Sequence, residues 1–345
     1  MKEKNIFTNP LVMTLLALLC CALWGSATPF IKIGYELVLP VRDVASTILF
    51  AGIRFFLAGV FTVVIFSIAR RRLIYPKKEN LTRVGIISIF QTIVQYIFFY
   101  LGLAITSGVK GTVISGGSVF FAILISSLIF HQEKLTVRKI VACIVGFAGI
   151  IVINFAGLEP TVNLGDVFVL LSTVSLAISS VLIKRFSAHE DPVTISAYQF
   201  ILGGALMSIG ALIAGGRVSL SDLRGVLVLL YLALLSAVAY SVWGILLKFN
   251  PVSRVTVFTF MTPVFGVLLS LLLLTGEDAK VDPINLVITL VLVSLGIFIL
   301  NYQKASKDAL PYSTEQALIE SATARDESEI TVEGEEQEKS ATEQI

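Results

Sequence analysis

The sequence predicts an all-α integral membrane protein with ten transmembrane helices, arranged as two inverted repeats of five helices each. Three observations predict this fold. The composition is too apolar for a soluble protein, ten long apolar segments follow one another, and the second half repeats the pattern of the first. Of the 345 residues, 56% are hydrophobic and 14% are charged, whereas soluble domains are about 45–50% apolar and roughly 25% charged. A soluble enzyme, a DNA-binding domain, a coiled coil and a secreted disulfide scaffold are therefore all disfavoured.

Ten segments are each long and apolar enough to cross a bilayer. A hydrocarbon core about 30 Å thick needs roughly 20 apolar residues in a helix, which rises about 1.5 Å per residue. The connections are short, so consecutive helices are expected to be antiparallel neighbours. The predicted spans are residues 12–33, 47–69, 84–103, 109–130, 137–155, 164–184, 193–214, 225–247, 254–275 and 284–302.

The distribution of Lys and Arg predicts the orientation. With ten spans, both chain ends lie on one side of the membrane, and that side would carry 17 basic residues against six on the other. Because basic residues collect in cytoplasmic loops, we expect a multi-pass protein of the cytoplasmic membrane with both termini, including segment 1–11, in the cytoplasm. The run Arg70–Arg72 is interpreted as a topology anchor, and the minor alternative is a nucleic-acid or anionic-lipid site. The lipid bilayer is an expected partner and nucleic acid is not.

The net charge of +2 is the sum of two unlike parts. Residues 1–302 hold 22 basic and 13 acidic residues, whereas residues 303–345 hold four basic and eleven acidic ones. A segment so acidic and poor in large apolar side chains cannot bury enough surface to offset the entropy lost on ordering. We therefore expect residues 303–345 to form a disordered acidic cytoplasmic tail.

The second half of the chain repeats the first in a collinear order. At an offset of 144, Tyr96 meets Tyr240, and Glu133 meets Glu277. Further matches at nearby offsets align Arg54-Phe55 with Gln199-Phe200 (145), Gly149 with Gly296 (147) and Lys32 with Lys184 (152). A unit of five spans is odd, so the second copy, residues 164–302, must enter the membrane from the side opposite to the first copy, residues 12–155. Inverted repeats of this kind are typical of transporters that open a central site alternately to each side.

Several stretches carry a family resemblance over residues 12–302. They are Trp24-Gly25-Ser26-Ala27-Thr28-Pro29-Phe30 with Lys32, Arg54-Phe55-Phe56-Leu57-Ala58-Gly59, Phe130-His131-Gln132-Glu133-Lys134-Leu135, and Thr262-Pro263-Val264-Phe265 before Gly276-Glu277. With them the chain resembles the drug/metabolite transporter superfamily, specifically its EamA-type group. It departs from the family pattern at Val119, where a proline is often seen, and at Gln132, where a glycine is common. The resemblance implies two repeats of five spans and transport, with a substrate range of amino acids, other metabolites, cations and drugs.

Polar and aromatic side chains at helix depth are the candidates for a substrate cavity, because a buried polar group is costly unless it is paired or faces water. Packing is the alternative for most of the hydroxyls, which often bond back to their own helix turn. For the two glutamines, one helical turn apart on span three, a cavity is favoured. The candidate cavity residues are Trp24, Thr28, Gln91, Gln95, Tyr96, Ser115, Ser118, Ser172, Ser175, Tyr240, Trp243 and Thr259.

Charged residues and helix ends provide a second set of candidates. Arg54 lies within span two, where an ionised group suggests a functional site, although it could also extend to the outer interface. Lys32 could bind a substrate carboxylate or act as an interfacial anchor. Glu133 and Glu277 end spans four and nine, where gating or helix-end pairing is favoured over substrate contact, and Pro263 offers a local backbone irregularity for motion.

The sequence also predicts what the protein does not need. No metal site, cofactor or catalytic residue is expected, because no metal-binding, P-loop or CxxC motif is present. No Asp or Glu lies in mid-span, so a facilitator or a substrate-driven exchanger is expected rather than a proton-coupled pump. The predicted function is transport of a small organic metabolite, amino acid-like or amphipathic, or a drug, by alternating access and in the direction of efflux, by a monomer or a homodimer. The alternatives are a nucleotide-sugar or phosphorylated-sugar carrier and a membrane-embedded lipid-handling enzyme.

Overall fold

A computed structural model describes residues 5–106, 108–155, 161–273 and 282–302. Contacts divide the chain into two units, Met1–Asn301 and Tyr302–Ile345, and the helices among the described residues belong to the first. The predicted acidic tail, residues 303–345, and Glu277 lie outside the described residues. Within the described residues all regular structure is helical, which confirms the predicted all-α class.

Ten helical stretches are long and apolar enough to cross a membrane, as the hydropathy predicts. Six of them are single helices: α1 (Pro10–Val38), α2 (Val44–Ala69), α7 (Val137–Asn154), α8 (Leu164–Phe186), α9 (Pro192–Ile213) and α10 (Leu223–Phe249). A seventh, α13 (Pro283–Asn301), ends the described part. Side-chain caps define where several of them begin: Asp43 accepts a hydrogen bond from the Ser46 amide, and Asp191 accepts one from the Thr194 amide just before Pro192. These are the residue types that satisfy free amides at a helix start.

Three spans are interrupted. Span three consists of α3 (Leu81–Ile87), the π-helical stretch η3 (Ser88–Val94) and α4 (Gln95–Leu103). Span four breaks at Gly117 between α5 (Gly108–Gly116) and α6 (Ser118–Leu124), and ends in a π-helical turn η4 (Ile125–Ile129). Span nine consists of α11 (Val252–Thr256), the 3₁₀ turn η6 (Val257–Phe260) and α12 (Met261–Leu273), with Pro263 in its first turn. Such irregular turns are frequent at functional sites of helices.

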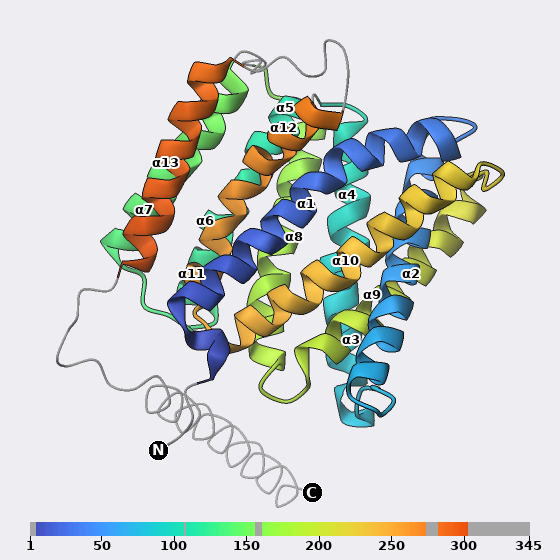
Figure 1. Ribbon diagram of the computed structural model, residues 1–345, viewed down its shortest axis with the longest axis horizontal. Coiled ribbons are helices and arrows are strands. Elements are labelled where there is room, and N and C mark those ends of the chain that lie inside the picture. The colour runs from blue at the N-terminus through green and yellow to red at the C-terminus, as the bar shows by residue number, and fades with distance from the viewer. Residues whose placement is uncertain (1–4, 107, 156–160, 274–281, 303–345) are drawn as a thin grey trace, which may run out of the picture. The chain divides into compact units, whose positions relative to one another are not determined.

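The helices pack in a pattern that stays the same when the two repeats are exchanged. Helix α2 packs on its equivalent α9, and α7 packs on its equivalent α13, at opposite ends of the bundle in Figure 1. Helix α1 packs on α10 and α12, which belong to spans eight and nine, and its equivalent α8 packs on α4, α5 and α6 of spans three and four. The contacts are those expected when a two-fold axis relates the two repeats.

Glycines show how closely the equivalent helices approach. A Cβ added at Gly59 would lie 2.6 Å from the Ala197 carbonyl oxygen, and one added at Gly204 would lie 2.8 Å from the Gly52 carbonyl oxygen. At the offset of 145, Gly59 corresponds to Gly204 and Gly52 to Ala197, so the α2–α9 contact is reciprocal. Backbones can approach this closely only where the side chains are very small.

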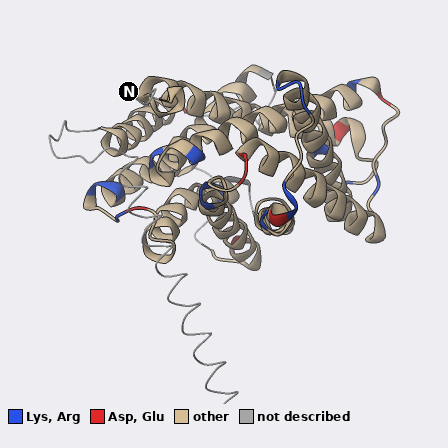
Figure 2. Ribbon diagram, turned by 90° about the horizontal axis from the view of Figure 1, so that it is seen from below, with Lys and Arg blue, Asp and Glu red and all other residues tan. Residues whose placement is uncertain are grey.

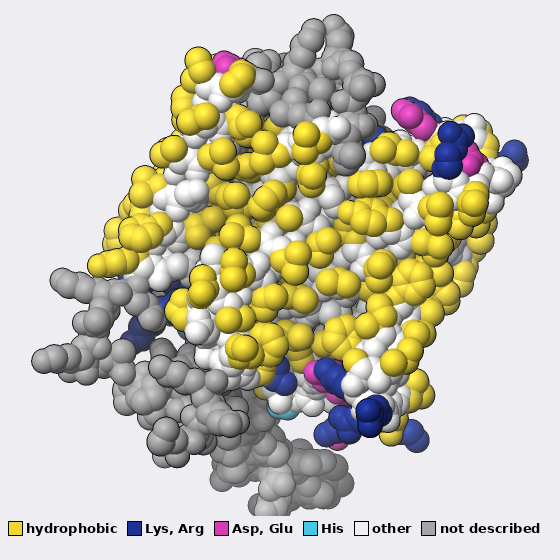
Figure 3. Space-filling view, viewed as in Figure 1, with side chains coloured by type: hydrophobic (Ala, Val, Ile, Leu, Met, Phe, Trp, Pro, Cys, Tyr) yellow, Lys and Arg dark blue, Asp and Glu magenta, His cyan; other side chains and the backbone are white. Residues whose placement is uncertain are grey.

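The outside of the bundle suits a lipid environment. Figure 3 shows hydrophobic side chains over one face of the helices, with Lys, Arg, Asp and Glu gathered towards the two ends. Figure 2, seen from below, shows that most of the ribbon carries neither Lys and Arg nor Asp and Glu. Large side chains such as Ile68, Val137 and Ile213 are 73–83% exposed, which would be unfavourable in water and is normal for a membrane span.

Candidate functional site

Aromatic rings from both repeats meet in the interior of the bundle. The hydroxyl oxygens of Tyr96 and Tyr240 lie 2.8 Å apart in a hydrogen bond. Beside them the rings of Phe55 and Phe200 stack at 5.1 Å between centroids, and Phe55 also contacts Tyr96 at 4.4 Å. Tyr96 and Tyr240 are equivalent at the offset of 144, and Phe55 and Phe200 at 145. Both contacts therefore join a residue to its own counterpart in the other repeat.

Both tryptophans of the chain adjoin this cluster. The Trp24 ring, on α1, meets Tyr240 edge-on at 5.1 Å and Trp243 at 4.9 Å between centroids. The Trp24 Nε1 atom is buried and finds no hydrogen-bond partner among the described residues. A buried indole N–H normally donates to a partner, so the ring presents an unused donor beside the aromatic cluster.

Arg54 of α2 brings a positive charge to the same place. Its side chain is 4% exposed, and its Nε and Nη2 atoms donate to the Ser236 hydroxyl oxygen at 3.1 and 3.0 Å. The guanidinium lies 5.1 Å from the Phe55 ring centroid and interacts electrostatically with Tyr96 and Tyr240. The alternative in which Arg54 extends to the interface is therefore wrong, because Ser236 and the aromatic rings hold it inside. No ion pair joins Arg54 to a carboxylate within the described part of the chain.

Gln199 occupies the equivalent position in the second repeat. The Thr92 hydroxyl donates to the Gln199 Oε1 atom at 2.6 Å, whereas in the other half Arg54 donates to the Ser236 hydroxyl, so the same positions pair with donor and acceptor exchanged. Thr92 and Ser236 correspond at the offset of 144, so the two hydrogen bonds are counterparts. The Gln199 Nε2 atom is buried without a partner among the described residues. The two halves of the site thus pair the same two positions, with a charged guanidinium in one and a neutral amide in the other.

Gln199 and Phe200 were not among the candidates predicted from sequence, although the repeat alignment itself pairs them with Arg54 and Phe55. Arg54 is noticeable in the sequence because a charged residue within a membrane span is unusual. Only the pairing of equivalent positions indicates that the neutral Gln199 shares its environment.

The predicted glutamines of span three are buried with unused acceptors. Gln91 lies in the π-helical stretch and Gln95 begins α4, next to Tyr96. They are 2% and 8% exposed, and the Oε1 atom of each lacks a partner among the described residues. An unpaired buried amide oxygen is costly. A hydrogen bond from a substrate or from water to either Oε1 atom would therefore be stabilising.

The predicted hydroxyls have mixed environments. Ser175 donates to the Phe90 carbonyl oxygen at 2.7 Å and so joins α8 to span three, and Thr259 bonds back to the Thr256 carbonyl oxygen. Ser172 and Ser118 are buried and Ser115 is half-buried. Thr28 is exposed beside Gly266 of α12, and no hydrogen bond joins it to the aromatic cluster within the described residues.

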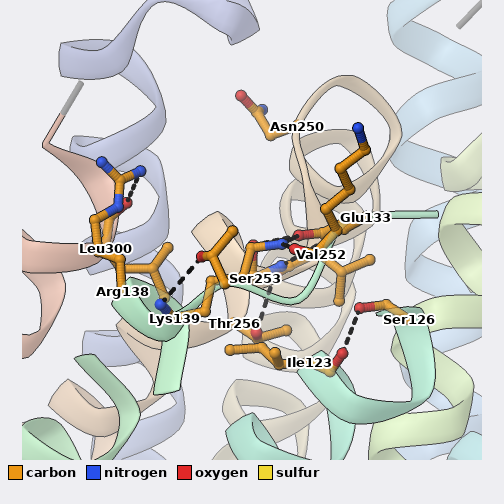
Figure 4. A network of polar contacts seen from close by, with 12 residues as sticks. Ile123, Ser126, Glu133, Arg138, Lys139, Asn250, Val252, Ser253, Thr256 and Leu300 are labelled. Atoms are coloured by element: carbon orange, nitrogen blue, oxygen red, sulfur yellow. Dashed lines mark hydrogen bonds and ion pairs between the residues drawn. The ribbon is translucent and has the colours of Figure 1, made fainter. Parts of the chain in front are cut away.

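Glu133 joins the two repeats at the end of span four. Its Oε1 atom accepts the Ser253 amide at 2.9 Å, and its Oε2 atom accepts the Ser253 hydroxyl and the Lys139 ammonium, the latter at 2.7 Å. Figure 4 shows Glu133 reaching across to the start of α11. Because Glu133 lies in the first repeat and Ser253 in the second, this network holds the halves together at that end. The other end of span four is held by the Lys110–Asp166 ion pair at 2.6 Å, which also joins the repeats.

The remaining predicted residues lie apart from the cluster. Lys32 is exposed on α1, Pro263 is half-buried in α12, and Glu277 lies outside the described residues. Within residues 5–106, 108–155, 161–273 and 282–302, no group of three or more His, Cys, Asp or Glu is placed to hold a metal ion.

Comparison with known proteins decides the family. The model of the EamA-like transporter family matches residues 11–155 and 163–302. The chain belongs to the EamA-like transporter family. It is therefore a multi-pass membrane transporter, and the resemblance to the EamA-type group is confirmed.

Similar proteins include other members of this class. An uncharacterized transporter of Archaeoglobus fulgidus is 31% identical over 288 residues, covering 80% of this chain and 94% of that protein. The uncharacterized inner membrane transporter YedA of Escherichia coli K12 is 27% identical over 291 residues, covering 80% and 89%. A protein of known crystal structure shares the fold with a TM-score of 0.69 at 17% identity, covering 84% of this chain and 96% of that one.

Proposed function

We propose that this EamA-like transporter carries a small organic solute, amino acid-like or amphipathic, out of the cell across the cytoplasmic membrane by alternating access. The observation that carries the proposal is the Tyr96–Tyr240 hydrogen bond between equivalent residues of the two repeats. A site beside the axis that relates two repeats is equally reachable from either side once one repeat moves against the other. Its lining of aromatic rings with a few amides and hydroxyls suits an organic molecule better than a bare ion.

The contacts between repeats at the two ends of span four support the same mechanism. Glu133 with Ser253 closes one end, and Lys110 with Asp166 closes the other. Opening the site to one side requires breaking one of these connections while the other holds. Each is a small set of hydrogen bonds and ion pairs, which a local movement of a helix end can exchange.

We further propose that transport is facilitated or driven by exchange of solutes, with both termini in the cytoplasm. The buried carboxylates Glu133 and Asp166 are engaged at helix ends, and a carboxylate relay for protons would need one at mid-span. Proteoliposomes holding the protein test this: we expect solute movement without acidification of the lumen. Solute movement that follows an imposed pH gradient and acidifies the lumen would contradict it.

The transport function itself is tested by profiling metabolites inside and outside cells. We compare cells with the wild-type protein, cells without it, and cells with the double variant Gln91→Ala and Gln95→Ala. Wild-type cells should accumulate one or a few small organic solutes outside, and the double variant should lose most of that accumulation. The matched control is Ile89→Ala, which removes an exposed apolar side chain from the same span.

Two outcomes would contradict parts of this proposal. If no small solute shifts between compartments, the transport proposal fails. If the double variant is produced normally and its profile matches the wild type, the assignment of the site to span three is wrong.

A further inference from the structure

We infer that Arg54 binds the carboxylate of the transported solute, and that this solute is a monoanion with an apolar or aromatic body. The inference rests on the proposed function only in its claim that the bound solute is transported. The binding site that it assigns can be tested without transport. It follows from the charge, the unused hydrogen-bond donors and the two-fold geometry around Arg54.

The charge of Arg54 is uncompensated by the described residues. A guanidinium keeps its positive charge in proteins, and burying a charge is strongly unfavourable unless an opposite charge or strong hydrogen bonds replace water. The groups found around it are the Ser236 hydroxyl, the Phe55 ring and the hydroxyls of Tyr35, Tyr96, Tyr100 and Tyr240. All of these are neutral. An anion bound beside them would supply the missing charge.

The guanidinium also has donors to spare. It carries five N–H groups in a fixed fork, and the described hydrogen bonds use only Nε and Nη2, both towards the single Ser236 oxygen. That oxygen donates its own hydrogen to the Leu232 carbonyl at 2.8 Å, so it is held as an acceptor for Arg54. The Nη1 edge makes no hydrogen bond to any described residue. A planar carboxylate is the partner that such an edge binds best.

Two other buried cations, each near the end of a helix, differ from Arg54 because a carboxylate pairs with them. Lys110 lies 2.6 Å from Asp166, and Lys139 lies 2.7 Å from Glu133. Both ion pairs are largely buried, so each of these two cations has a carboxylate of its own. Arg54 has none among the described residues, which marks it as a group left for a ligand.

The two-fold geometry limits the ligand to one negative charge. The counterpart of Arg54 is Gln199, whose amide is neutral and whose Nε2 donor is unused. A dianion such as a phosphate monoester would find one cation and keep an uncompensated charge in a buried site. A monocarboxylate is neutralised by Arg54 alone. Its body would then lie against the rings of Tyr96 and Trp24, which are only half-buried.

The chain provides its own probe for binding. It has two tryptophans, and both, Trp24 and Trp243, adjoin the site with ring centroids 4.9 Å apart. The tryptophan fluorescence of the purified full-length protein in detergent, excited selectively over the nine tyrosines, therefore reports on this site. We titrate it with a panel of carboxylates of two to nine carbons, aliphatic and phenyl-substituted, each paired with its uncharged amide, and with phenyl phosphate as the dianion.

At least one carboxylate should change the tryptophan fluorescence with an affinity about 10- to 100-fold tighter than its amide, as expected for a charge-assisted pair. Phenyl phosphate should bind more weakly than that carboxylate. Arg54→Gln should remove the preference for acid over amide, and Arg54→Lys should retain part of it. The matched control Arg217→Gln, an exposed arginine near the start of α10, should bind as the wild type does. If no acid is preferred over its amide by the wild-type protein, or if Arg54→Gln keeps the full preference, the inference is overturned.

The outcomes separate this inference from the proposed function. In proteoliposomes, the carboxylate that binds should exchange across the membrane when it is present on both sides. If it binds through Arg54 but does not exchange, the site stands and the transport proposal fails. If neutral solutes are exchanged and no carboxylate is preferred, transport stands and the role of Arg54 is refuted.

Discussion

Tyr96 and Tyr240 form the hydrogen bond that defines the centre of the molecule. The two hydroxyls occupy equivalent positions in the two repeats and form a hydrogen bond with each other. Neither is held by a hydrogen bond to another described side chain, so the energy of the pair depends on both being present. This dependence can be measured.

Tyr96→Phe and Tyr240→Phe should each lower the free energy of unfolding by about 0.5–1 kcal/mol, because each leaves one buried hydroxyl without its partner. The double variant should lose little more than either single one, which gives a coupling of about 0.5 kcal/mol. Unfolding by SDS in mixed micelles measures the four proteins of this cycle. Tyr75→Phe, at a tyrosine that is 68% exposed, is the control. Strictly additive losses would show that the two hydroxyls are not coupled.

At the scale of single residues, the sequence predicted which groups are polar and deep but not which way they face. It identified Tyr96, Tyr240, Trp24 and Arg54, which the structure brings together. It did not decide whether Arg54 is buried, since that depends on Ser236 of a helix about 180 positions later. Ser175 was predicted for a cavity, but its hydroxyl is used by the Phe90 carbonyl oxygen. A pattern along one helix does not show the hydrogen bonds made to its neighbours.

Helices α2 and α9 depend on close backbone contact along their crossing. A side chain on Gly204 would collide with the backbone of Gly52 and Phe56. Backbone atoms cannot rotate away as a side-chain end can, so the helices would have to separate. Six residues further along α9, Gly210 has open space on its outer side, which makes it a matched comparison.

Gly204→Ala should lower the free energy of unfolding by about 2 kcal/mol through overpacking. Gly210→Ala should leave it unchanged or raise it by about 0.5 kcal/mol, because alanine favours the helix over glycine. Both are measured by SDS unfolding and by the yield of monodisperse protein. Equal stability of the two variants would mean that α2 and α9 do not approach as closely as described.

At the scale of elements, the positions of the ten spans follow from hydropathy, because any helix crossing the bilayer must be apolar for about 20 residues. Their interruptions do not follow. The π-helical stretch Ser88–Val94 and the 3₁₀ turn Val257–Phe260 change the hydrogen-bonding partners of the backbone without changing its composition. Helix α1 runs through Pro29 without a break, so a proline alone does not mark where a span is interrupted.

For the whole molecule, the distribution of basic residues predicts an orientation that the fold does not itself fix. Both Arg42, between α1 and α2, and Lys78, between α2 and α3, are exposed. They lie at opposite ends of α2, so they should face opposite sides of the membrane. The three native cysteines are all buried, which leaves the surface open to labelling at introduced positions.

Arg42→Cys should react with a membrane-impermeant maleimide in intact cells, and Lys78→Cys should react only after the cells are permeabilised. The reason is the excess of basic residues on the side of Lys78, which retains that side in the cytoplasm. The wild-type protein, with its buried thiols, gives the background. The reverse pattern of labelling would invert the molecule and place both termini outside.

The repeat itself was visible in the sequence before any contact was known, because equivalent residues recur in order. The sequence repeat did not predict that equivalent residues contact each other. Tyr96 contacts Tyr240, and Phe55 contacts Phe200. Those contacts arise only when the two copies fold against each other.

The difference between Arg54 and Gln199 has a consequence for why both copies lie in one chain. A homodimer of separate five-helix subunits would carry identical side chains on both sides of the Phe55–Phe200 stack. Two arginines there would repel each other in a buried site, and two glutamines would leave no charge at all. Covalent joining of the copies lets each half of the site mutate independently. A single duplicated chain can therefore hold one charge at its symmetry axis, which a symmetric assembly of identical subunits cannot do.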